Sequence, residues 1–264
     1  MHCPLHIAPA RSFLAAFGVF LFAAATLTAL SEPAELSVAA TNVLDAVSAR
    51  YDLVTNVACT VRRAVSANGR GGGSAEAVSR IAWERGNRLN VQKLAPEKRR
   101  TVIDGQAVWT AAEGEEKPVT FAVSDQLPSQ AANLRSVPAS PEESLTTLDP
   151  ASAAEITPAA PPFARQIVFH YADTNAITAV AVLSFDADGF VCRMEAFTDE
   201  TRSALVFTTD FLAPFEPIPG VRLFRKIETV STIEGRTVRA VSSFSQLRVN
   251  EALPPSIFDP KAFF

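Results

Sequence analysis

An alternation of apolar and polar side chains with a period of two residues dominates this sequence and most restricts its fold. From residue 57 onward, alternating stretches are separated by turn dipeptides such as Gly86-Asn87, Asp104-Gly105 and Glu234-Gly235. This pattern is typical of antiparallel strands with one buried face. The turns divide the chain into about eleven or twelve strands, and a sheet of that size must curl or close on itself. The predicted strands lie at 57–65, 76–85, 88–94, 101–103, 106–111, 118–123, 164–171, 176–185, 190–197, 202–211, 221–233 and 236–249.

A single amphipathic helix is predicted ahead of these strands, at 37–54. Val43, Val47, Tyr51 and Val54 recur at helical spacing along one stripe, and Ser37 is a suitable N-cap. We expect one face of this helix to dock on the sheet.

A proline-rich stretch, 126–162, interrupts the strand pattern halfway along the chain. It contains two short helical candidates, 127–134 and 140–148, and Ser140-Pro141 followed by two glutamates is typical of a capped helix start. The remainder, 151–162, is interpreted as a loop. Composition alone leaves two interpretations open, a helical lid over the sheet or a plain solvated loop.

The N-terminal segment is interpreted as a secretory signal. Residues 13–30 form an uncharged apolar run after Arg11. Small residues at 29 and 31 suit cleavage after Ser31, and residues 23–25 are a second candidate. The alternative is a membrane anchor, which we disfavour because no basic cluster follows the run. We therefore expect a signal peptide at 1–31, a single domain at 32–264 and a periplasmic location. Export would permit a disulfide between Cys59 and Cys192, but we favour two buried free thiols.

Several functional classes are disfavoured by the charged and metal-binding residues. The net charge is −4, with 24 basic and 28 acidic residues, which argues against a nucleic-acid binder. After signal cleavage His170 would be the remaining histidine, and we interpret it as a residue of the sheet rather than a catalyst. Asp186-x-Asp188-Gly189 lacks the further ligands of a calcium loop and is interpreted as a hairpin turn. We predict no metal, no cofactor and no enzymatic activity.

Phenylalanines are concentrated in the second half of the predicted domain. Phe121 is the first of them after the signal, and Phe207 and Phe211 share one strand face. Most phenylalanines in a sheet of this size pack in the core, but a minority can line a cavity that a large curled sheet encloses.

The order of these elements resembles the periplasmic lipoprotein carriers of the LolA type. The similarity is carried by the helix and first strand, NVLDAVSARYDLVTNVACTVRRAV, by RIAWERGNRLNV (80–91), by VIDGQAVWTA (102–111) and by LSFDADGFVCRMEAF (183–197). The resemblance implies a mainly β fold: an incomplete, half-open antiparallel barrel with an N-terminal helix and a mid-chain helical lid.

The resemblance also implies roles for individual residues. Arg85 matches a lid-latching arginine, Leu89 matches a cavity aromatic, and Trp109 matches the tryptophan of the Asp-Gly hairpin. Alternation places Ile81 and Trp83 partly on the same face as Arg85, where lid carbonyls could accept its hydrogen bonds. Arg85 can equally be an exposed residue at the end of its strand.

Two functions follow from the resemblance. The first is a periplasmic carrier that binds acyl chains of lipoproteins or another lipid and moves them from the inner to the outer membrane. Its partners would be an inner-membrane exporter and an outer-membrane receptor, and it would be a monomer with transient membrane contact. The alternative is a lipid- or lipoprotein-sensing regulatory domain that acts by protein–protein contact.

Overall fold

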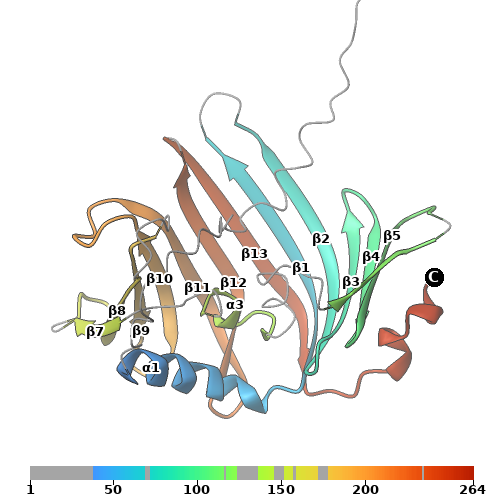
Figure 1. The fold of residues 1–264 in the computed structure, drawn as a ribbon, viewed down its shortest axis with the longest axis horizontal. Helices are drawn as coiled ribbons and strands as arrows, with labels where there is room; N and C mark the ends of the chain where they lie inside the picture. The colour runs from blue at the N-terminus through green and yellow to red at the C-terminus, as the bar shows by residue number, and fades with distance from the viewer. Residues whose placement is uncertain are drawn as a thin grey trace, which may run out of the picture. The chain divides into compact units, whose positions relative to one another are not determined.

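Thirteen antiparallel strands form one sheet in the computed structural model (Figure 1). The structure describes residues 38–68, 72–115, 117–123, 136–145, 152–156, 159–171, 178–233 and 235–264, which belong to one compact unit, Pro33–Phe264. The predicted signal peptide lies outside the described residues. The strands are β1 Asn56–Ala67, β2 Ser74–Glu84, β3 Arg88–Ala95, β4 Arg99–Asp104, β5 Ala107–Ala112, β6 Val119–Ala122, β7 Ser152–Ile156, β8 Arg165–His170, β9 Val180–Phe185, β10 Val191–Phe197, β11 Leu205–Ile218, β12 Val221–Ile233 and β13 Arg236–Val249.

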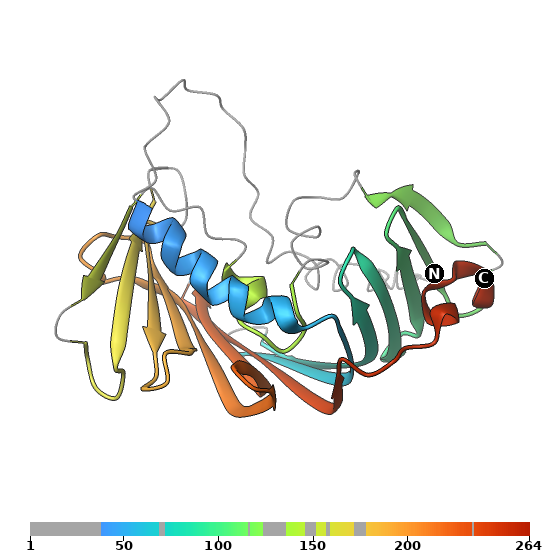
Figure 2. The same cartoon turned by 90° about the horizontal axis from the view of Figure 1, so that it is seen from below.

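The order of the strands leaves the sheet open. It runs β6-β5-β4-β3-β2-β1-β13-β12-β11-β10-β9-β8-β7, so β6 and β7 are the two edges. Strands β1 to β6 follow one another outward to one edge of the sheet. Strands β7 to β13 follow one another inward from the other edge, and β13 pairs with β1. The sheet curves as a trough (Figure 2). The prediction of a mainly β, half-open fold is confirmed at this level.

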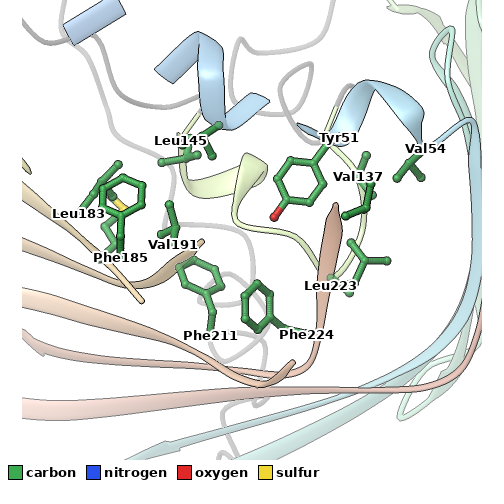
Figure 3. Close-up of a cluster of buried hydrophobic side chains, with 14 of the residues drawn as sticks. Tyr51, Val54, Val137, Leu145, Leu183, Phe185, Val191, Phe211, Leu223 and Phe224 are labelled. Atoms are coloured by element: carbon green, nitrogen blue, oxygen red, sulfur yellow. The ribbon is translucent and has the colours of Figure 1, made fainter. Parts of the chain in front are cut away.

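The N-terminal helix α1 (Val38–Ala49) lies along the inner side of the trough and continues into the 3-10 helix η2 (Arg50–Leu53) (Figure 2). We call the side of the sheet that faces α1 the inner face. Val47, Tyr51 and Val54 are buried there, as the helical stripe predicts. Figure 3 shows Tyr51 and Val54 in the cluster of buried side chains with Leu223 and Phe224 of β12. Burial of a side chain of this size contributes about 1.5–3 kcal/mol, so the helix is a structural part of the fold.

The mid-chain stretch 126–162 differs from the prediction of a helical lid. Among its described residues the only helix is the single turn α3 (Glu142–Leu145), and it begins after Ser140 as predicted. The Ser140 hydroxyl accepts the N–H of Glu142, which is the expected cap. The first helical candidate, 127–134, lies outside the described residues. No mid-chain helical lid is seen in the part that is described.

The same stretch also supplies a strand that the sequence did not predict. Residues 152–156, interpreted as loop, form edge strand β7 and pair with β8. This strand raises the total from the predicted eleven or twelve to thirteen. Its sequence is rich in alanine and has low β propensity, so the pairing depends on the available edge of β8.

The 136–145 segment packs into the core instead of covering the trough from outside. Val137, Ala139 and Leu145 are buried, and the Phe224 N–H of β12 donates to the Ala139 carbonyl at 2.9 Å. Figure 3 shows Val137 and Leu145 among the core side chains. Their burial fixes this segment against the inner face.

Two short 3-10 helices close the chain, η4 (Pro255–Phe258) and η5 (Pro260–Ala262). They pack on β3 and β4, where the Asn90 amide donates to the Ile257 carbonyl at 2.6 Å and Phe258 is buried. Asn90 alternates with Leu89, which packs toward the inner face, so this tail covers the outer face.

The two cysteines of the predicted domain are free thiols, which is the alternative that the sequence favours over a disulfide. Cys59 on β1 is buried, and burial raises the pKa of its thiol to about 12. Cys192 is on β10, and three strands separate β1 from β10 in the sheet. Neighbouring strands lie about 4.8 Å apart, so the two sulfurs are too far apart to bond. None of the helices among the described residues has the length and apolar character needed to cross a membrane.

Candidate functional site

A row of apolar side chains crosses the inner face from the middle of the sheet to the β6 edge. The register pairs each member with the next one on the neighbouring strand. Because directly paired residues point to the same face, the row forms one continuous surface. We call it the inner stripe, and it consists of Trp83, Leu89, Ile103, Val108 and Phe121.

The inner stripe combines buried and partly exposed side chains. Trp83, Ile103 and Val108 are buried, Leu89 is partly exposed, and 36% of Phe121 is exposed. Partly exposed apolar side chains on the uncovered side of a sheet are candidates for a binding face. The stripe brings together three of the predicted site residues, Trp83, Leu89 and Phe121.

The other predicted residues of this face lie beside the inner stripe or within the core. Ile81 lies two residues before Trp83 on the same side of β2 and is partly buried, as is Phe207 on β11. Phe211 is buried, and its ring centroid lies 5.5 Å from that of Phe224 (Figure 3). Phe211 is therefore a core residue, which is one of the two roles, core packing or cavity lining, that the sequence left open for it.

Trp109 lies on the opposite face from the inner stripe. It pairs with Val102, whereas the neighbouring Ile103 pairs with Leu89 of the stripe. Successive residues of a strand point to opposite faces. The resemblance placed Trp109 with the other site residues, but the register separates it from them.

Arg85 follows β2 and holds the end of the N-terminal helix rather than a mid-chain lid. Its Nε donates to the Val54 carbonyl at 3.1 Å and its Nη2 to the Tyr51 carbonyl at 2.6 Å. Its Nη1 lies 3.4 Å from the Asp52 carboxylate. Backbone carbonyls accept its hydrogen bonds, as expected, but they belong to η2 and the residue after it. The guanidinium also lies 5.7 Å from the Trp83 ring centroid.

A second contact, which the sequence did not reveal, anchors the same helix from the other side. Arg50 donates to the Gly189 carbonyl at 2.8 Å. Two guanidiniums lie over the Phe190 ring: that of Arg50 is 4.5 Å from the ring centroid and that of Arg222 is 4.1 Å from it. The Tyr51 hydroxyl donates to the Arg222 carbonyl at 3.0 Å. Burial raises the pKa of Tyr51 above its ordinary value, so its hydroxyl remains a donor.

The Asp186–Gly189 turn is a structural hairpin, as predicted. The Asp186 carboxylate accepts the N–H groups of Asp188 and Phe190, both at 3.0 Å. Arg222 forms ion pairs with Asp186 and with Asp188, the second at 2.8 Å. These contacts occupy the carboxylates that a calcium loop would use. In the described residues no three His, Cys, Asp or Glu side chains form a group that could hold a metal ion.

Glu142 of the 136–145 segment is a buried carboxylate near this helix end. It accepts the Val137 N–H at 2.8 Å. Burial raises the pKa of Glu142, and nearby Asp52 adds to this, while the Val137 N–H and the charge of Arg85 oppose it. The sequence showed this glutamate only as a residue of the first helical turn.

The hollows found in the described part of the chain lie away from the predicted site. One, of about 380 Å³, is lined by residues of β1, β2 and β13 including Glu76 and Arg239. The other, of about 410 Å³, is lined by residues including Phe215 and Arg222. Neither is lined by a predicted site residue, so the inner stripe does not form the wall of either hollow.

Comparison with known proteins shows which fold the chain has. No protein-family model matches the sequence, and no curated protein matches it significantly. The structure is similar to a DUF1329 family protein from Desulfovibrio piger, with a TM-score of 0.54, 13% identity and coverage of 86% of this chain and 98% of that one. It is also similar to an outer membrane lipoprotein-sorting protein domain from Vibrio parahaemolyticus, with a TM-score of 0.51, 12% identity and coverage of 83% and 96%.

The chain has the fold of an outer membrane lipoprotein-sorting domain. A LolA superfamily protein from Nitrosomonas europaea is a further structural neighbour, with a TM-score of 0.46, 13% identity and coverage of 83% and 96%. The matches to the Desulfovibrio and Vibrio proteins confirm the predicted resemblance in fold. Because the identities are low, the likeness to this sorting-domain fold defines architecture rather than activity.

Proposed function

We propose that this protein is a periplasmic carrier that binds acyl chains of lipoproteins or of another lipid and moves them from the inner to the outer membrane. In this proposal residues 1–31 are a cleaved signal peptide and 32–264 form the single lipid-binding domain. The carrier is a monomer, contacts membranes transiently, and exchanges cargo with an inner-membrane exporter and an outer-membrane receptor. It performs no catalysis.

The observation that carries the proposal is the inner stripe, with Phe121 exposed at its open end. An acyl chain on this surface gains roughly 0.8 kcal/mol for each CH₂ group that it buries. Leu89, Phe121, Ile81 and Phe207 are the proposed contacts, because they share the inner face and remain partly exposed. The fold shared with a lipoprotein-sorting domain agrees with such a role.

Trp83 and Arg85 have supporting roles in this proposal. Trp83 is 1% exposed and forms the buried end of the inner stripe. Arg85 is a positioning residue, because it holds η2 beside that end through the Tyr51 and Val54 carbonyls. The orientation of η2 then determines how far an acyl chain can extend past Trp83.

A matched pair of variants tests the carrier proposal. Phe121 and Leu212 are each 36% exposed, but Leu212 pairs with Lys226 on the outer face, where Lys226 binds Glu228. Residues 32–264 are titrated with an acyl fluorophore, and lipids that co-purify from a bacterial periplasm are identified by mass spectrometry. We expect Phe121→Ser to weaken fluorophore binding about tenfold, since loss of this aromatic removes about 1.5 kcal/mol of burial, and Leu212→Ser to leave binding unchanged.

Two results would refute the carrier proposal. One is an unliganded protein that fails to bind the fluorophore, which would favour the regulatory alternative. The other is equal weakening by Phe121→Ser and Leu212→Ser, which would place the acyl chain away from the inner face.

A further inference from the structure

Three charged side chains lie on the inner face of strands β1–β6, and all three are cations: Arg63, Lys93 and Arg99. On β3, Lys93 follows Leu89 by four residues, and on β4, Arg99 precedes Ile103 by four, so both share the face of the inner stripe. On β1, Arg63 follows Val61, which packs against the core cluster, by two residues. We call these three residues the cationic rim.

The geometry of the cationic rim places like charges side by side. Lys93 and Arg99 are directly paired across β3 and β4. Like charges in directly opposed positions destabilise a sheet. Arg63 lies two strands away on the same face, where it pairs with Ala77 of β2. Within the described residues none of the three forms an ion pair or a side-chain hydrogen bond.

Acidic neighbours do not neutralise the cationic rim. Glu113, which directly follows β5, pairs with Lys98 at 3.0 Å, and Glu115 accepts the Ala112 N–H at 2.6 Å. In the described part of the chain, Glu97 of the β3–β4 turn makes no ion pair with Lys93 or Arg99.

The outer face of the same strands provides a contrast. Its arginines include two that are matched to acids: Arg62 pairs with Glu76 at 3.2 Å, and Arg88 pairs with Glu84. All acidic side chains of β1–β6 lie on this outer face by alternation. The excess positive charge on the inner face is therefore a local property of the surface that carries the inner stripe.

The cationic rim and the inner stripe lie on the same face and are separated along the strand direction. Four residues along a strand span about 13 Å, so this distance separates the rim from Leu89 and Ile103. Between them, Val91 and Thr101 form a directly paired step. A molecule with an anionic head at the rim could thus lay an apolar tail on the stripe without leaving the inner face.

We propose that the cationic rim binds the phosphate of an anionic phospholipid whose acyl chains lie on the inner stripe. This inference rests on the proposed function and narrows its cargo to a phosphate-bearing lipid. Guanidinium groups form charge-assisted, bidentate hydrogen bonds with phosphate, and the ammonium of Lys93 adds a third positive charge. A bound phosphate also removes the repulsion between Lys93 and Arg99, because both then face a common anion.

The test compares loading of two fluorescent lipids from vesicles into residues 32–264. The lipids are phosphatidylglycerol, which is anionic, and phosphatidylcholine, which has the same chains but no net charge. The wild type is expected to load phosphatidylglycerol about tenfold better at low salt, with the preference falling as salt screens the charges. The triple variant Arg63→Gln, Lys93→Gln, Arg99→Gln should lose the preference and load phosphatidylcholine like the wild type.

A matched triple variant on the outer face controls for net charge. Arg62→Gln, Arg80→Gln and Arg239→Gln remove three exposed arginines from that face, and the preference should persist. If the inner-face triple variant fails to fold, Lys93→Gln alone should lower the preference about threefold. That substitution removes a like-charge contact and should fold.

The outcomes separate this inference from the function on which it rests. Equal loading of both lipids by the wild type would overturn the cationic rim while leaving the carrier intact. Loading of neither lipid would overturn both. Displacement of phosphatidylglycerol by millimolar inorganic phosphate, with phosphatidylcholine unaffected, supports the rim. A protein that binds inorganic phosphate but loads neither lipid would overturn the proposal.

Discussion

Arg85 links the strand that carries Trp83 to the end of the N-terminal helix. It donates to the Val54 carbonyl and to the Tyr51 carbonyl, which also accepts the Val54 N–H at the end of η2. A positive charge at this end of a helix also interacts favourably with the helix dipole. The residue is 40% exposed in its side chain, so solvent screens part of this interaction.

Replacement of Arg85 by leucine should destabilise the protein by about 1 kcal/mol, because two carbonyls lose charged donors at a half-exposed position. Urea unfolding of residues 32–264 measures this change. Arg62→Leu is the control: it removes an exposed arginine from β1 and should change stability by less than about 0.5 kcal/mol. A loss for Arg62→Leu equal to that for Arg85→Leu would contradict the role of Arg85 in holding η2.

The sequence predicted individual site residues where strand alternation was regular. Leu89, Ile81 and Trp83 lie on the inner face because β2 and β3 keep an even register. Trp109 was misplaced because the similarity of its hairpin to a family motif gives no register. That Arg99 opposes Lys93 could not be predicted either, because it depends on the register between β3 and β4.

At the scale of elements, the 136–145 segment behaves as part of the core. Its turn was predictable from Ser140 and Pro141, since a cap is a local feature. Its burial was not predictable, because it depends on contacts with β12 that are distant in sequence. Strand β7 was missed for the same reason: its alanine-rich sequence favours no strand until β8 offers an unpaired edge.

Glu142 makes this element sensitive to pH. Burial raises the pKa of its carboxyl in the folded protein above the unfolded value, so the folded state retains the proton to higher pH. Its contribution to stability is therefore largest at low pH and falls as pH rises above about 4.5. Glu142→Gln lacks this titration and keeps an acceptor for the Val137 N–H.

We therefore expect Glu142→Gln to gain stability relative to the wild type as pH increases from 4.5 to 7. Urea unfolding of both proteins at several pH values provides the comparison, and Glu76→Gln, on the exposed outer face, is the control. A difference that moves in the opposite direction would mean that Arg85 stabilises the charged carboxylate by more than burial opposes it.

At the scale of the whole sheet, the two faces differ in chemistry. The outer face of the central strands carries ion pairs such as Arg193–Asp210 and Arg239–Glu228. The inner face carries the core cluster, the inner stripe and the cationic rim. Periodicity predicted a large antiparallel sheet, curled or closed, and one docked helix, and the resemblance implied that the sheet stays half open. It could not show which apolar face stays partly exposed, because that depends on where α1 and residues 136–145 pack.

The central claim is that an acyl chain lies on the inner stripe. The most direct measurement uses a photoreactive fatty acid that carries its reactive group on the alkyl chain, cross-linked to residues 32–264 and mapped by peptide mass spectrometry. The account predicts adducts on peptides of β2, β3 and β6, concentrated at Ile81, Leu89 and Phe121, and their loss when unlabelled lipid competes. Adducts confined to the outer face, around Trp109 or Leu212, would contradict it.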